Sequence, residues 1–129
     1  MNYQHAIHWA ICNPPSSSSI YPIGQEQTDM QEVIPAFVIT LPLCLTDSVN
    51  RHFSGGTLQS LLQMIYGFYQ EPVTPEEVVR IMNLSAFNRN RMIRLSERQQ
   101  AGDIVRRVDV VGPSASYEGI RANVLLLDV

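Results

Sequence analysis

Arginine is the residue type whose spacing most clearly suggests chemistry in this chain of 129 residues, because its nine basic residues are all arginine and none is lysine. Arg91, Arg94 and Arg98 are spaced i, i+3 and i+7, which places them along one side of a helix. The planar guanidinium group binds phosphate and carboxylate groups in a bidentate manner. This spacing therefore predicts a site for an anion, with an affinity that falls steeply as salt is added.

The charge is distributed unevenly along the chain. Residues 1–79 carry seven acidic side chains against Arg51, a net charge of −6, whereas residues 80–107 carry seven arginines against Glu97 and Asp103, a net charge of +5. The basic segment predicts contact with RNA or another anionic partner. The residues of this predicted site are Arg89, Arg91, Arg94, Arg98, Arg106 and Arg107. The alternative is that these arginines pair with the acidic first part of the chain, within one copy or across a dimer.

Histidine and cysteine offer two further kinds of chemistry, and neither is complete. His5 and His8 lie three residues apart in a strand pattern, so they point to opposite faces and form a poor metal-binding pair. Cys12 or Cys44 could pair with His52 as nucleophile and base, but neither cysteine follows a catalytic motif or precedes a helix. We expect no metal, no cofactor and no catalytic residue, and we interpret the protein as non-enzymatic.

A small glycine-rich turn, Ser54-Gly55-Gly56-Thr57, precedes a helical pattern and could present backbone N–H groups to an anion. It lacks the Lys-Ser/Thr pair of a P-loop, so nucleotide hydrolysis is not predicted. The simpler interpretation is a tight turn into a helix.

Length and composition indicate one folded domain over residues 1–129, since 45% of the residues are hydrophobic and only 16% are charged. No apolar run approaches the roughly 18 residues of a membrane-spanning helix. The first residues lack the basic and then apolar pattern of a secretory signal, and two cysteines are too few for a disulfide scaffold. We therefore expect an intracellular, cytoplasmic protein without a transmembrane segment.

The elements that must position these residues follow from the hydrophobic spacing. Apolar residues alternate over 4–12 and 33–45, which predicts two strands, each with one buried face. The serine and proline content between them predicts an exposed, flexible loop over about residues 13–31. Three helices are predicted next: residues 58–69, residues 75–84 behind a Thr74–Glu77 capping box, and residues 86–101 ending at Gly102.

Two strands are predicted to close the chain, an alternating one over 104–111 and one over 120–129 that is apolar on both faces. The order ββαααββ predicts an α+β fold with two layers, in which two or three helices cover one face of a mainly antiparallel sheet of about four strands. A strand that is apolar on both faces belongs in the middle of a sheet or under a partner. We therefore expect the protein to form a homo-oligomer.

Two functions remain open on these grounds. The first is a small accessory, adaptor or structural protein that makes protein–protein contacts and self-associates through strand edges or apolar helix faces. The second is a nucleic-acid or anionic-surface binding protein that works through the arginines. A compact, lysine-free chain without a catalytic motif would suit a viral or pathogen accessory protein.

Overall fold

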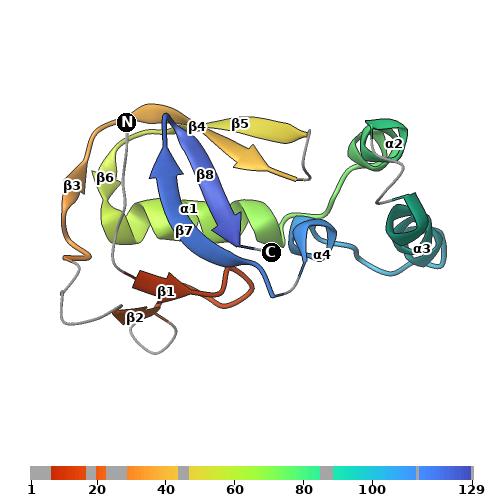
Figure 1. The fold of residues 1–129 in the computed structure, drawn as a ribbon, viewed down its shortest axis with the longest axis horizontal. Coiled ribbons are helices and arrows are strands. Elements are labelled where there is room, and N and C mark those ends of the chain that lie inside the picture. The colour runs from red at the N-terminus through yellow and green to blue at the C-terminus, as the bar shows by residue number, and fades with distance from the viewer. Residues whose placement is uncertain are drawn as a thin grey trace.

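The computed structural model describes residues 7–16, 20–22, 29–43, 47–84, 89–112 and 114–128. These residues form an α+β fold, as the sequence predicts (Figure 1). The strands are β1 (Ile7–Trp9), β2 (Ile20–Pro22), β3 (Val33–Ile34), β4 (Phe37–Pro42), β5 (Ser48–Phe53), β6 (Gly56–Thr57), β7 (Ser116–Arg121) and β8 (Val124–Asp128). The helices are α1 (Leu58–Gln70), α2 (Pro75–Leu84), α3 (Arg89–Gln100) and α4 (Arg107–Val111).

The central sheet has four strands in the order β5-β4-β8-β7. β4 pairs antiparallel with β5, and β7 pairs antiparallel with β8, while β4 and β8 run parallel where Thr40 meets Val124. Two further pairs, β1 with β2 and β3 with β6, are antiparallel and separate from this sheet. The prediction of a mainly antiparallel sheet of about four strands is therefore confirmed.

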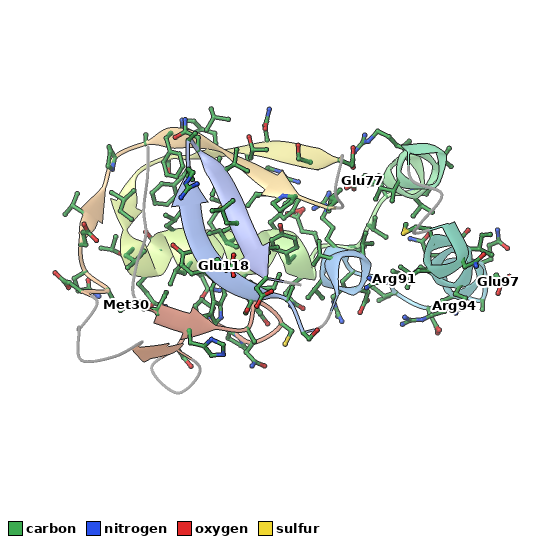
Figure 2. The ribbon with its side chains drawn as sticks, in the orientation of Figure 1. Met30, Glu77, Arg91, Arg94, Glu97 and Glu118 are labelled. Atoms are coloured by element: carbon green, nitrogen blue, oxygen red, sulfur yellow. The ribbon has the colours of Figure 1, made fainter. Side chains whose placement is uncertain are left out.

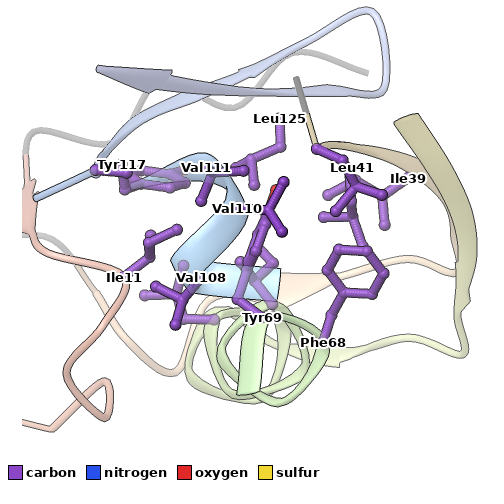
Figure 3. Close-up of a cluster of buried hydrophobic side chains, with 14 of the residues drawn as sticks. Ile11, Ile39, Leu41, Phe68, Tyr69, Val108, Val110, Val111, Tyr117 and Leu125 are labelled. Atoms are coloured by element: carbon purple, nitrogen blue, oxygen red, sulfur yellow. The ribbon is translucent and has the colours of Figure 1, made fainter. Parts of the chain in front are cut away.

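One face of the sheet is covered by α1 and α4. The predicted helix over 58–69 is confirmed as α1, which buries its apolar side at helical spacing. The short helix α4 fills the space between α1 and the strands (Figure 3). Figure 3 shows this core, built from Ile11, Ile39, Leu41, Phe68, Tyr69, Val108, Val110, Val111, Tyr117 and Leu125.

The helices α2 and α3 pack against each other beyond the end of α1, away from the sheet (Figure 1). We call α2 and α3 together the helical hairpin. The segments that precede and follow the helical hairpin lie side by side, and Val73 N donates a hydrogen bond to Val105 O at 2.9 Å. At the start of α2 the predicted capping box is confirmed: Glu77 N donates to Thr74 Oγ1 at 3.1 Å, and Thr74 N donates to Glu77 Oε1 at 3.2 Å.

The prediction of a strand over residues 104–111 is wrong, because residues 107–111 form α4. The buried side chains of α4 follow helical spacing: Arg107, Val108, Val110 and Val111. The Asp109 carboxylate accepts a hydrogen bond from Arg106 N at 3.0 Å and closes the first turn. A valine-rich run of this length is compatible with the hydrophobic period of a strand and with that of a helix, and burial between α1 and the sheet selects the helix.

The prediction of one strand over residues 120–129 is also wrong in its extent. The chain forms a hairpin in which β7 and β8 are joined by Ala122 and Asn123, with φ angles of 51° and 64°. Two successive positive φ angles define a type I′ turn, for which alanine is not a usual sequence signal. β8 does lie in the middle of the sheet, but β4 and β7 of the same chain flank it. The apolar C-terminal run is therefore no longer a reason to expect a homo-oligomer.

Three strands were not predicted, β2, β5 and β6, and β7 begins four residues before the strand predicted over 120–129. The loop predicted over residues 13–31 contains β2, which pairs with β1, and within that loop Pro15 is buried. Residues 17–19 and 23–28 lie outside the described residues, so the flexibility of this segment stays a prediction. β5 escapes the sequence pattern because most of its side chains are polar. The third predicted helix is described from Arg89 onward, and Gly102 follows it with a φ of 94°. No helix in the described part of the chain is long and apolar enough to span a membrane.

Candidate interaction surface

The outer edge of β5 is the candidate site for contact with another chain. β5 is the end strand of the sheet and, among the described residues, it pairs with β4 alone. The strand at the opposite end differs, because Ile11 N donates to Ala115 O at 3.1 Å and Ala10 forms a bridge with Ser116, so the residues after β1 cover part of the β7 edge. The sheet is thus left with one long edge that no described segment pairs with.

The register of β5 on β4 tells which backbone groups of β5 point outward. Thr40 N donates to Asn123 O at 2.8 Å, so the amide of Thr40 points toward β8 and away from β5. Thr40 faces Asn50 in the register, which makes this a pair without backbone hydrogen bonds. Because the two kinds of pair alternate along an antiparallel ladder, the N–H and C=O groups of Asn50 and His52 point out of the sheet.

The two faces beside this edge have different chemistry. The side chains of Asn50 and His52 are exposed and lie on the face of the sheet that no described element covers, called the uncovered face below, where Thr40 Oγ1 donates to Asn50 Oδ1 at 2.8 Å. The same face carries Val38, whose exposed fraction is 50%, and Val124, whose exposed fraction is 37%. An uncovered sheet face with apolar side chains next to a free edge is typical of a protein interaction surface.

Arg51 lies on the other face of β5, toward α1. Its Nη2 atom lies 3.1 Å from Glu71 Oε2, and its guanidinium carbon lies 5.3 Å from the centre of the Phe68 ring. The single charged side chain of β5 is thus neutralised within its own chain. It does not need an external partner.

The predicted anion-binding arginines are not brought together, and Arg107 is separated most clearly. Only 5% of Arg107 is exposed, and its Nη2 and Nε atoms lie 2.9 and 3.2 Å from the two carboxylate oxygens of Glu77. Its Nη1 atom lies 2.5 Å from Glu71 Oε2, and its guanidinium group lies over the Phe68 ring at 4.4 Å. Arg107 therefore joins α4 to α2 inside the molecule and is inaccessible to an external anion.

The pKa values of this buried pair shift toward the charged forms. Burial by itself raises the pKa of Glu77, but hydrogen bonds from Arg107 and Thr74 outweigh it and hold that pKa below its usual value. Burial by itself lowers the pKa of Arg107, and hydrogen bonds to Glu77 and Glu71 outweigh it in turn. Both side chains are thus ionised at neutral pH, as in a structural ion pair.

The remaining predicted arginines are divided between the surface and internal contacts. Arg91 is half-buried and donates a hydrogen bond from Nη2 to Asp109 O at 2.5 Å, so it lies between α3 and α4 (Figure 2). Arg98 Nε lies 3.7 Å from Asp103 Oδ2, while Arg94 and Arg106 are exposed. Arg89 begins α3, and its side chain lies outside the described residues. The predicted alternative, in which these arginines pair with the acidic first part of the chain, thus accounts for Arg107, whereas Asp103, the partner of Arg98, belongs to the basic segment itself.

Arg80 also pairs with an acidic residue that the sequence alone did not connect to it. Its Nε and Nη2 atoms lie 2.6 and 2.9 Å from the two oxygens of Asp47, which is 8% exposed. Asp47 directly precedes β5 and Arg80 lies on α2, so this bidentate pair joins the helical hairpin to the sheet.

The helix start that follows the turn at Ser54–Thr57 uses its backbone donors inside the protein. Leu58 N donates to Glu32 O and Gln59 N donates to Met30 O, both at 2.9 Å, and Ser60 N donates to Thr57 Oγ1 at 3.2 Å. The first amides of α1 are therefore occupied, which agrees with the interpretation of a tight turn into a helix.

The remaining candidate residues do not gather into a chemical centre in the described ranges. There, no group of three or more histidine, cysteine or acidic side chains is placed to hold a metal ion. His8 is exposed on β1 and Cys12 is half-buried, while His5 and Cys44 lie outside the described residues.

No protein-family model, curated protein or solved structure matches this chain.

Sequence reasoning missed β5 as a strand and so as a candidate interaction element. The signal that could have found it is the alternation of Val49, Arg51 and Phe53 with three polar residues, which the structure resolves into one half-buried and one exposed side. A strand of this composition suits the edge of a sheet, where one side and one edge face solvent.

Proposed function

We propose that this is a small, non-enzymatic interaction protein that self-associates through the outer edge of β5. The observation that carries the proposal is the edge itself: six residues, Ser48–Phe53, in continuous register with β4 and without a strand on their other side in the described structure. Outward N–H and C=O groups of such a strand bind another strand by extending the sheet.

The composition of β5 supports this use of its edge. Proteins commonly protect exposed edges with proline, lysine or a β-bulge, and β5 has none of these. An inward-pointing charge is a further protective device, but Glu71 of the same chain already pairs with Arg51. The uncovered face beside the edge adds Val38 and Val124 as apolar contacts for whatever extends the sheet.

Sedimentation velocity of the pure protein tests the proposal when Asn50→Pro is compared with Asn50→Ala. Proline removes an N–H that points out of the sheet, so the fold tolerates it at this edge position while a second strand loses a hydrogen bond. Alanine also loses the 2.8 Å bond from Thr40 but keeps the backbone donor. We expect the parent and Asn50→Ala to sediment as oligomers at tens of micromolar and Asn50→Pro to shift toward the monomer. A parent protein that stays monomeric contradicts the proposal.

A second candidate function, binding of RNA or another polyanion, is favoured by the placement of Arg94 and Arg98. Both are exposed and lie about one turn apart on α3. Replacement of both by glutamine should abolish RNA binding at roughly 50 mM salt, because these contacts are electrostatic and are screened by salt. The melting temperature should not change, because both side chains are solvent-exposed. Absence of RNA binding by the parent protein contradicts this candidate.

A further inference from the structure

We infer that two copies join their β5 strands antiparallel about a two-fold axis at Asn50, so that two four-stranded sheets become one continuous sheet. This inference rests on the proposed self-association and adds its geometry. A two-fold axis perpendicular to the sheet makes the paired strands antiparallel and keeps α1 of both copies on the same side. Both uncovered faces, with Val38 and Val124, then form one surface.

Hydrogen-bond geometry limits the possible registers. The outward N–H and C=O groups belong to alternate residues of β5, among them Asn50 and His52. In an antiparallel pair, residues of this outward set must face one another, and so must residues of the inward set. Each allowed two-fold register therefore places one residue of β5 opposite its own copy.

Overlap and charge select among these registers. An axis at Asn50 or at Arg51 pairs five of the six residues of β5, whereas an axis at Val49 pairs only three of them. The axis at Arg51 sets two arginines directly opposite each other, and like charges in such a pair destabilise it. The axis at Asn50 instead places Arg51 opposite Val49 of the second copy, where its aliphatic stem can pack.

The axis at Asn50 also gives a consistent set of contacts on the uncovered face. His52 of each copy lies opposite Ser48 of the other, and the two Asn50 residues form the central hydrogen-bonded pair. Thr40 holds the Asn50 side chain through the 2.8 Å hydrogen bond, so the central residue is already oriented before association.

Disulfide trapping tests this register in the full chain with Cys12→Ser and Cys44→Ser. Facing residues of a hydrogen-bonded antiparallel pair have Cα atoms about 5.5 Å apart, within the range of a disulfide. We expect Asn50→Cys to form a covalent dimer on mild oxidation. Ser48→Cys and His52→Cys serve as matched controls: each residue lies roughly 13 Å from its own copy and should not crosslink alone, whereas a mixture of the two proteins should crosslink.

The possible outcomes separate the register from the proposed function. Covalent dimers of Asn50→Cys and of the Ser48→Cys/His52→Cys mixture support the register. Crosslinking of Arg51→Cys or Val49→Cys in place of Asn50→Cys overturns the register but leaves self-association through β5 in place. Covalent dimers from none of these variants, with a parent that sediments as an oligomer, overturn the use of this edge. A monomeric parent overturns both the register and the proposed function.

Discussion

The sheet with α1 and the helical hairpin differ in what holds them in place. The body around the sheet is held by apolar packing: of the twelve largest fully buried side chains among the described residues, only Ile81 lies in the helical hairpin. The helical hairpin contributes fewer buried apolar side chains, among them Val78, Ile81 and Met92, and the Arg107–Glu77 and Arg80–Asp47 pairs also join it to that body. Apolar burial does not depend on pH or salt in the way that ion pairs do. The comparison teaches that the helical hairpin should open before the sheet does.

The largest expected effect is that of Arg107→Met. This change leaves Glu77 as a buried carboxylate without its main partner, and loss of one member of a buried pair costs about 3–5 kcal/mol. Urea unfolding followed by circular dichroism, together with proteolysis of the helical hairpin, measures the loss. Arg106→Met is the matched control, because Arg106 is next to Arg107 in the chain and its side chain is exposed. Equal, small losses for the two variants would show that the buried pair does not hold the helical hairpin.

Acid should open the helical hairpin before the sheet. The pKa of Glu77 in the folded protein lies below its unfolded value of about 4.5, so its ion pair stabilises the fold above that pH and the stabilisation is lost as the pH falls through the folded pKa. Hydrogen exchange between pH 7 and pH 3 should show α2 amides losing protection first. Glu77→Gln should weaken this pH dependence. Parallel loss of protection in α2 and β4 would contradict the comparison.

A smaller effect, confined to the body, is expected for Tyr69→Phe. The Tyr69 hydroxyl donates to Pro42 O at 2.7 Å, and its burial raises the pKa of the phenol far above the usual value. Loss of this hydroxyl should cost about 1–2 kcal/mol of unfolding free energy, with no dependence on pH between 4 and 9. Thermal unfolding at several pH values checks this, with Tyr66→Phe on the same helix as a control that should lose less. A pH-dependent loss would indicate that the body also relies on ionised groups.

The smallest effect is expected for Arg94→Gln, which should leave the melting temperature unchanged because this side chain is exposed. Arg91→Gln should lower it measurably, since Arg91 donates to Asp109 O between α3 and α4. Differential scanning calorimetry of the two variants compares surface and internal arginines on one helix. A larger loss for Arg94→Gln would reverse that assignment.

Much of the fold was predictable wherever a local pattern had only one solution. The capping box of Thr74 and Glu77, the apolar spacing of α1 and the alternation of Phe37, Ile39 and Leu41 all led to the elements observed. Prediction failed where a local pattern permitted two solutions. The valines of α4 suit a strand by propensity, and the alternation in β5 is weak because only Val49 and Phe53 are apolar.

The candidate site was less predictable than the fold. The sequence located the arginines and their spacing, but it could not show that Arg107 is buried against Glu77, thirty positions earlier in the chain. It likewise could not identify Ser48–Phe53 as the end strand of the sheet, because strand order depends on pairings between segments far apart in sequence.

The sequence by itself determined the α+β class, the helix α1, the helix α2 with its capping box, and the buried side of β4, because these features depend on neighbours within a few positions. The tertiary structure alone decided that residues 107–111 are helical, that Arg107 and Arg80 join the helical hairpin to the sheet, and that no described segment pairs with the outer edge of β5. Each of these depends on what distant segments bury or leave uncovered. Burial and long-range pairing outweigh local propensity when the local pattern is compatible with more than one structure.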